Sequence, residues 1–174
     1  MVEIPSYFQR LFTADEIKAR VRELGAEIER DYKGRSLHLV GVLRGATTFL
    51  ADLSRVIDLP LTYDFIAVSS YKGTSSSGQV KLVKDLDESV ESRYVLIIED
   101  IIDSGLTLNY IKEMLQARKP ASLAVCTLLD RPHKLEVDLL LDYVGFTIPD
   151  KFVVGYGLDF EQKWRNLPDI WAIN

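Results

Sequence analysis

The chain contains several uninterrupted apolar runs, and these runs predict buried β-strands. Residues 94–98 lack the apolar/polar alternation of a half-exposed strand, which favours a parallel strand buried on both faces. Residues 79–84 do alternate, with Val80 and Leu82 facing inward, and this pattern predicts the returning arm of a hairpin. Further strands are expected at residues 37–43, 61–68, 121–129 and 139–146.

Helical patterns lie between these runs. Thr13, Ala14, Asp15 and Glu16 form a capping box that predicts the start of a helix ending near Tyr32. A second helix is expected over residues 47–57, and a third runs from the Ser104–Thr107 turn to about Arg118. Strands that alternate with helices predict an α/β fold built on an open, mainly parallel, twisted sheet with flanking helices.

The composition limits the number of domains, the location and the partners of the protein, and it agrees with the predicted α/β fold. With 174 residues, 47% of them hydrophobic, the chain can bury one core, and we expect a single domain over residues 1–174. The sequence has no 18-residue apolar run and a polar start, so we expect a cytoplasmic protein with no membrane segment. The single cysteine, Cys126, lies in an apolar run and is expected to be a buried thiol. A net charge of -5 argues against a general affinity for nucleic acid.

The most informative chemistry follows the strand at residues 94–98. Three carboxylates come directly after it, at Glu99, Asp100 and Asp103, where a parallel sheet forms its ligand crevice. The turn Ser104–Thr107 then opens a helix whose free amides, with two hydroxyls, would hold a phosphate. Its one glycine suits a single phosphate group, and the turn matches neither a dinucleotide fingerprint nor a P-loop.

The position of carboxylates beside a bound phosphate requires an explanation, because their negative charges repel each other. Glu99 and Asp100 make sense there if they accept hydrogen bonds from a sugar diol, or reach the anion through a divalent cation such as Mg²⁺. A phosphorylated ribose with Mg²⁺ satisfies both conditions, and Asp103 is then free for proton transfer. An isolated acidic pair is usually solvated surface, but the third carboxylate and the phosphate turn favour a site.

Residues 99–107 (EDIIDSGLT) resemble the phosphoribosyl pyrophosphate signature of type I phosphoribosyltransferases. Four further segments make the chain similar to the hypoxanthine-guanine phosphoribosyltransferase family in its short bacterial form. They are residues 41–45, 69–71, 126–132 and 148–160. The five segments agree with the family in order and spacing over nearly the whole chain.

The resemblance implies an activity: Mg²⁺-dependent transfer of a phosphoribosyl group from phosphoribosyl pyrophosphate to N9 of hypoxanthine or guanine, giving IMP or GMP and pyrophosphate. It also implies the type I fold, with a small hood built from the N- and C-terminal segments, and a homodimer or homotetramer. Asp103 would be the catalytic residue. The phosphoribosyl group, with its 5′-phosphate, would be bound by Glu99, Asp100, Ser104, Gly105, Leu106 and Thr107. Pyrophosphate would be bound by Arg44, Gly45, Ser70, Tyr71 and Arg165. The purine would be bound by Ile101, Arg131, Phe152, Val153 and Asp159, and the metal by Glu99, Asp100 and Asp159.

Two arginines depart from the family pattern. Arg44 and Arg131 stand where members often have lysine, which keeps the charge but changes its geometry. The family also implies a cis peptide bond before Arg44 and a closing lid over residues 69–78, with Tyr71 covering the pyrophosphate. Arg165 could instead be a surface charge on a helix, and Phe152 could be an ordinary core residue.

Other functions stay open at this point. A xanthine-preferring enzyme would use the same residues, whereas adenine presents an amino group where Arg131 expects an oxygen acceptor. Some proteins with this signature bind RNA as regulators, but the acidic composition gives that function little support. A Rossmann or receiver domain would share the strand and helix pattern, although the glycine fingerprint is absent.

Overall fold

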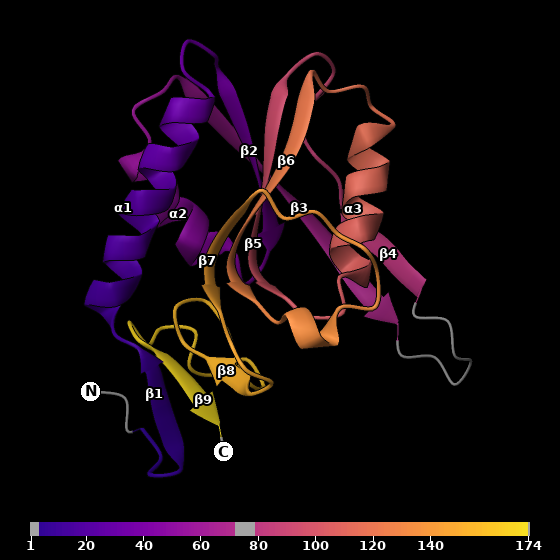
Figure 1. Cartoon of the computed structure of the whole chain (residues 1–174). Coiled ribbons are helices and arrows are strands. Elements are labelled where there is room, and N and C mark those ends of the chain that lie inside the picture. The colour runs from indigo at the N-terminus through magenta and orange to yellow at the C-terminus, as the bar shows by residue number, and fades with distance from the viewer. Residues whose placement is uncertain (1–3, 72–78, 174) are drawn as a thin grey trace.

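The computed structural model describes residues 4–71 and 79–173, and in them a six-stranded sheet carries three α-helices (Figure 1). The sheet order is β4-β3-β2-β5-β6-β7, in which only β4 is antiparallel. Its strands are β2 (Leu37–Leu43), β3 (Leu61–Tyr71), β4 (Gln79–Lys84), β5 (Tyr94–Ile102), β6 (Ser122–Asp130) and β7 (Tyr143–Thr147). The predicted open, mainly parallel α/β sheet is therefore confirmed.

Helices cover both faces of this sheet. Helices α1 (Ala14–Asp31) and α2 (Thr47–Val56) lie on one face, and α3 (Leu106–Gln116) lies on the other (Figure 1). Two hydrophobic clusters result, because alternate residues of the central strands point to opposite faces: Leu96 and Ile98 join the α1/α2 side, while Val95 and Ile97 join the α3 side. The central strands are thus buried on both faces, as their apolar runs predicted.

The start of α1 follows the predicted capping box. The Glu16 amide donates to Thr13 Oγ1 at 3.2 Å, and the Thr13 amide donates back to Glu16 Oε2 at 2.8 Å. The buried face of the helix carries Ile17, Val21, Leu24 and Ile28, and its C-cap is Tyr32.

A second, three-stranded antiparallel sheet consists of β1 (Phe8–Phe12), β9 (Ile170–Ile173) and β8 (Phe152–Val154) in that order. With the connecting residues 155–169 it forms the hood, which lies beyond the carboxyl ends of the main strands (Figure 1). Tyr156 ties the hood to α2 by donating its hydroxyl to Asp52 Oδ2 at 2.6 Å. The predicted hood from both terminal segments is confirmed.

Three predicted boundaries were wrong. Strand β5 continues to Ile102, so Glu99 and Asp100 lie inside the strand rather than after it. Strand β3 continues through Tyr71, so residues 69–71 pair with β4 instead of opening the loop; residues 72–78 lie outside the described part. Strand β7 begins at Tyr143 rather than at residue 139, because the Asp142 carboxylate takes the Val125 amide at 2.8 Å. Residues 139–141 instead pack against the α3 cluster.

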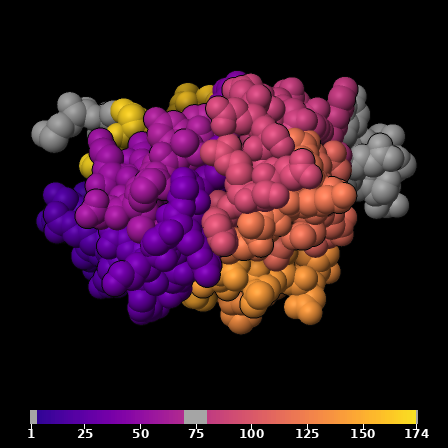
Figure 2. Space-filling model, turned by 90° about the horizontal axis from the view of Figure 1, so that it is seen from above, coloured from indigo at the N-terminus to yellow at the C-terminus, as the bar shows by residue number. Residues whose placement is uncertain are grey.

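Figure 2 views the end of the molecule opposite the hood, where the N-terminal third of the chain (indigo to purple) lies beside the segments that follow residue 80 (pink to orange). Cys126 is buried, as expected, and burial raises the pKa of its thiol. Among the described residues, no helix is long and apolar enough to cross a bilayer.

Candidate active site

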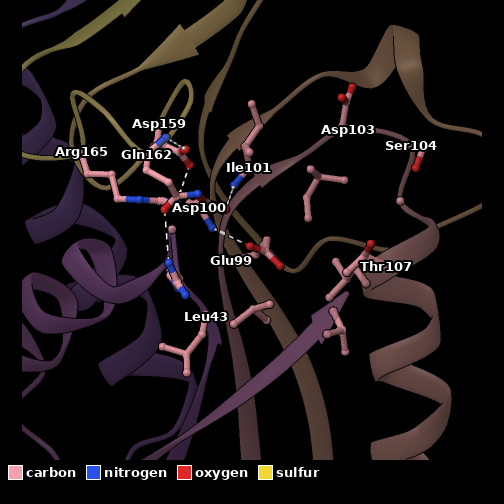
Figure 3. Close-up of a pocket in the computed structure, with 17 residues that line it drawn as sticks. Leu43, Glu99, Asp100, Ile101, Asp103, Ser104, Thr107, Asp159, Gln162 and Arg165 are labelled. Atoms are coloured by element: carbon pink, nitrogen blue, oxygen red, sulfur yellow. Dashed lines mark hydrogen bonds and ion pairs between the residues drawn. The ribbon is translucent and has the colours of Figure 1, made fainter. Parts of the chain in front are cut away.

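A cavity of about 470 Å³ opens where the carboxyl ends of β2 and β5 face the hood (Figure 3). It brings together most of the residues that the sequence singled out. Those lining it are Arg44, Gly45, Glu99, Asp100, Ile101, Asp103, Ser104, Gly105, Thr107, Asp159 and Arg165. Three segments far apart in the chain, residues 44–45, 99–107 and 159–165, therefore meet at one edge of the sheet.

Glu99 and Asp100 form the acidic floor of this cavity. Glu99 is only 7% exposed, and its Oε1 accepts the Asp100 amide at 3.1 Å. Asp100 Oδ1 in turn accepts the Ile101 amide at 2.8 Å. Burial, and then the neighbouring charge of Asp100, raise the pKa of Glu99 well above its ordinary value. A cation or a hydrogen-bond donor bound here would relieve that repulsion.

The phosphate turn lies at the opposite end of the cavity from the hood (Figure 3). Gly105 is the N-cap of α3 with φ of 79°, a left-handed conformation that favours glycine, and no side chain caps the helix. The Leu106 amide makes a long contact of 3.4 Å to Ser104 Oγ. Thr107 lines the cavity, whereas Leu106 does not and is 39% exposed.

The turn after β2 brings Arg44 and Gly45 against the acidic floor. The Leu43–Arg44 peptide bond is cis, as the resemblance implied. Gly45 packs directly on Asp100, since a β-carbon on Gly45 would lie 1.6 Å from Asp100 Oδ2. The Arg44 side chain reaches the hood, where Nη1 donates to Gln162 Oε1 at 3.2 Å.

The hood supplies Asp159, Gln162 and Arg165. Asp159 Oδ1 pairs with Arg165 Nη2 at 2.5 Å, and Asp159 Oδ2 accepts the Gln162 amide at 2.8 Å (Figure 3). Arg165 lies in a turn before β9 and on no helix, so its helical alternative was wrong. Sequence reasoning missed Gln162, because nothing in its neighbourhood distinguishes it from an ordinary surface amide.

A smaller cavity of about 230 Å³ adjoins the first and shares with it the residues Asp100, Ile101, Asp103 and Asp159. Its other walls are Arg131, Phe152, Val153 and Leu158. Phe152 is 48% exposed and touches Phe160 edge-on, with ring centroids 5.5 Å apart, so the alternative of a core phenylalanine was wrong. All the predicted base-binding residues thus surround one small space.

Arg131 is the buried cation of this smaller cavity. It is 6% exposed, and its Nη1 lies 3.7 Å from Asp103 Oδ1 and 4.0 Å from Asp150 Oδ1. Lys134 completes a four-charge network, with Nζ 2.9 Å from Asp150 Oδ1 and 3.9 Å from Asp103 Oδ1. Its hydrogen bond to Lys134 lowers the pKa of Asp150.

Lys134 and Asp150 were also missed from the sequence. For Lys134 the spacing was a usable signal, because it follows Arg131 by three residues. The 3₁₀ turn Pro132–Lys134 places residues three apart on the same side, so Lys134 lies next to Arg131. The side chains of Ser70 and Tyr71 lie outside the described part of the structure, and their predicted contact with pyrophosphate stays a prediction.

Comparison with known proteins identifies the family. Residues 9–161 match the model of the phosphoribosyl transferase domain. The chain is 53% identical over 161 residues to the hypoxanthine phosphoribosyltransferase of Salmonella typhimurium, covering 91% of this chain and 90% of that protein. The chain belongs to the hypoxanthine-guanine phosphoribosyltransferase family.

Other members of this phosphoribosyltransferase family agree. The Bacillus subtilis hypoxanthine-guanine phosphoribosyltransferase is 53% identical over 94% of this chain and 91% of its own. A crystal structure of a Staphylococcus aureus hypoxanthine phosphoribosyltransferase superposes with a TM-score of 0.92 and 48% identity, covering 95% of this chain and 91% of that one. The chain spans a quarter of the length of the Listeria bifunctional TilS/HprT proteins, to which it is also 52–53% identical.

Proposed function

We propose that this phosphoribosyltransferase transfers the 5-phosphoribosyl group of phosphoribosyl pyrophosphate to N9 of hypoxanthine or guanine. The bond from the ribose anomeric carbon to pyrophosphate breaks, the bond to N9 forms, and the products are pyrophosphate and IMP or GMP. The names of the Salmonella and Bacillus relatives support the purine substrate. The purine salvage role and a cytoplasmic location stay predictions with it.

One observation supports this proposal above the others: two cavities of different chemistry meet at Asp100, Ile101, Asp103 and Asp159. The larger one has an acidic floor and a helix N-terminus, which suit a ribose diol and a phosphate. The smaller one has an exposed aromatic ring and a buried guanidinium, which suit a purine that carries an oxygen acceptor. The reacting carbon and nitrogen would meet at the boundary that the two cavities share.

Asp103 is the candidate for the proton. It lines both cavities, its side chain is 54% exposed, and Arg131 and Lys134 lie within 4 Å of its Oδ1. Its carboxylate therefore lies at the boundary of the two cavities, where it could accept a hydrogen bond or a proton from purine N7. A purine that shares its proton with Asp103 becomes the better nucleophile as the ribose carbon turns cationic.

Arg131 would donate to the purine O6 oxygen. Its burial and its flanking carboxylates hold the guanidinium in place, and its Nε has no partner among the described residues. The Phe152 ring would stack on the base, and the Val153 backbone would contact its edge. Ser104, Gly105, Leu106 and Thr107 would hold the 5′-phosphate at the start of α3.

Mg²⁺ fits the acidic floor as part of a complex with substrate. Glu99 and Asp100 are adjacent carboxylates, and burial and then the charge of Asp100 raise the pKa of Glu99. A cation bound there would compensate the charge of the pair. The described residues hold no group of three side chains that could bind a metal alone, so oxygens of the ribose or the pyrophosphate would complete its coordination. When bound, the ion would neutralise the charge on the leaving pyrophosphate. Asp159 would face a second ion through the carboxylate that now pairs with Arg165.

The experiment is pyrophosphate release measured with hypoxanthine, guanine, xanthine or adenine, each with and without Mg²⁺. We expect release with hypoxanthine or guanine only when Mg²⁺ is present, and none with adenine, because its amino group cannot accept from Arg131. Release with xanthine in preference to both would support the alternative substrate. The absence of pyrophosphate release with both hypoxanthine and guanine would refute the proposal. Size measurement in solution tests the predicted homodimer or homotetramer.

A further inference from the structure

Gln162 holds together the two arginines that line the pyrophosphate end of the cavity. Its Oε1 accepts from Arg44 Nη1 at 3.2 Å and from Arg165 Nη2 at 3.4 Å. These two arginines come from different parts of the chain, Arg44 from the turn after β2 and Arg165 from the hood. A single neutral oxygen therefore lies between two guanidinium groups.

The charges around this oxygen are not balanced. Arg165 has a carboxylate partner in Asp159, at 2.5 Å, but the Arg44 guanidinium contacts no carboxylate within ion-pair distance in the described residues. Two cations that converge on a neutral acceptor have unused affinity for an anion. An anionic oxygen in the same place would add a charge–charge attraction to both guanidinium groups that the neutral amide oxygen lacks.

The backbone around Gln162 presents this amide without enclosing it. Gln162 has φ of 65° and its amide donates to Asp159 Oδ2 at 2.8 Å, so the main chain is fixed. Its side chain is exposed and can swing into solvent. Arg165 is also fixed from behind, because Nη1 donates to Gly157 O at 2.7 Å. The side chain of Gln162 can thus leave while Arg165 keeps its position.

We infer that Gln162 is a positioning residue whose side-chain oxygen stands where an oxygen of pyrophosphate binds, and that the ligand displaces it. This inference rests on the proposed function. A neutral amide gathers the two guanidinium groups before the substrate arrives and yields to the diphosphate when it binds. It competes again for the same donors when pyrophosphate leaves. A carboxylate in this position would form ion pairs with both arginines, and the diphosphate would not displace it.

Two variants separate displacement from a merely structural role. Gln162→Ala removes the competing acceptor, and we expect magnesium pyrophosphate to bind about three- to tenfold more tightly, the factor expected from one or two weak hydrogen bonds. Gln162→Glu keeps the shape and adds a charge, and we expect binding about tenfold weaker or more. Titration calorimetry with inorganic pyrophosphate and Mg²⁺ measures both. A structural role would weaken binding in both variants.

Glu161→Gln is the matched control. It changes the charge of the residue directly before Gln162, and that residue makes no contact with either arginine among the described residues. It should leave pyrophosphate binding within about twofold of wild type. IMP binding should stay unchanged in all three variants, which shows that each is folded. Shifts in the same direction for Gln162→Ala and Gln162→Glu, or no shift in either, overturn the inference. Wild type that binds no pyrophosphate overturns the proposed function as well.

Discussion

Gly45 has no room for a side chain, because the Asp100 carboxylate lies where a β-carbon would stand. That β-carbon would be 1.6 Å from Asp100 Oδ2 and 2.5 Å from Asp100 Cγ. Gly45→Ala is therefore a way to move one catalytic-site carboxylate without touching its chemistry. The backbone at Gly45 is not in the left-handed region, so alanine can adopt its conformation.

The size of the effect follows from the clash. Real contacts to a β-carbon stay beyond 3.0 Å, so Oδ2 must move from 1.6 Å to at least that distance, a shift of about 1.4 Å. A misplacement of about 1 Å in a reacting site can cost 10²-fold in rate, so we expect kcat/KM to fall about 100-fold. Stability should change little. Moving the Asp100 carboxylate aside should lower the free energy of unfolding by about 1 kcal/mol. Replacing glycine by alanine offsets about half of that loss, because alanine reduces the conformational entropy of the unfolded chain.

Steady-state kinetics and a melting curve test this expectation. The melting temperature should stay within about 3 °C of wild type, since 1 kcal/mol shifts a domain of this size by about 2–4 °C. Asp100→Ala is the control background: with no carboxylate to displace, adding Gly45→Ala should cause no further loss of kcat/KM. Wild-type activity in Gly45→Ala, or losses that add in the double variant, would refute the reasoning.

Three other variants test single residues of the site. Asp103→Asn should lower kcat by about 10²- to 10⁴-fold with an unchanged melting temperature, and undiminished turnover would contradict its role in proton transfer. Thr107→Val should raise the KM for phosphoribosyl pyrophosphate, and an unchanged KM would count against the phosphate turn. Glu99→Gln should alter the pH dependence of stability in the ligand-free protein. Because the pKa of Glu99 is raised in the fold, wild type loses stability as pH climbs from 4.5, its ordinary value, through that raised value. The Glu99→Gln variant should not show this loss in denaturant titrations. Identical pH profiles of stability for wild type and variant would contradict the prediction.

The sequence predicted the parts of the fold that are determined locally. The strand containing Leu96 is apolar on both faces, and the α1 capping box satisfies its own amides, so neither depends on distant residues. The hood strands β1, β8 and β9 are three to five residues long and pair across the whole chain, so only the family resemblance indicated them. Asp142 shows the same limit, because its carboxylate ends the expected pairing of residues 139–142 through a tertiary contact.

The candidate site divides in the same way. Glu99, Asp100 and Asp103 could be found from sequence because a buried strand delivers them to a known edge of the sheet. Gln162 could not, because its importance comes from two arginines that only the folded chain brings to it. Residues whose function depends on partners from other elements carry no local signal.

The order of charges across the two cavities explains why the carboxylates lie in the middle. Arg44 and Arg165 stand at the pyrophosphate end, Arg131 stands at the base end, and the acidic floor of Glu99 and Asp100 lies between them. In the proposed reaction, negative charge grows on the departing pyrophosphate while positive charge grows on the ribose carbon. Cations at the end and carboxylates at the centre stabilise both changes at once, because each fixed charge faces a charge of opposite sign that increases as the bond breaks.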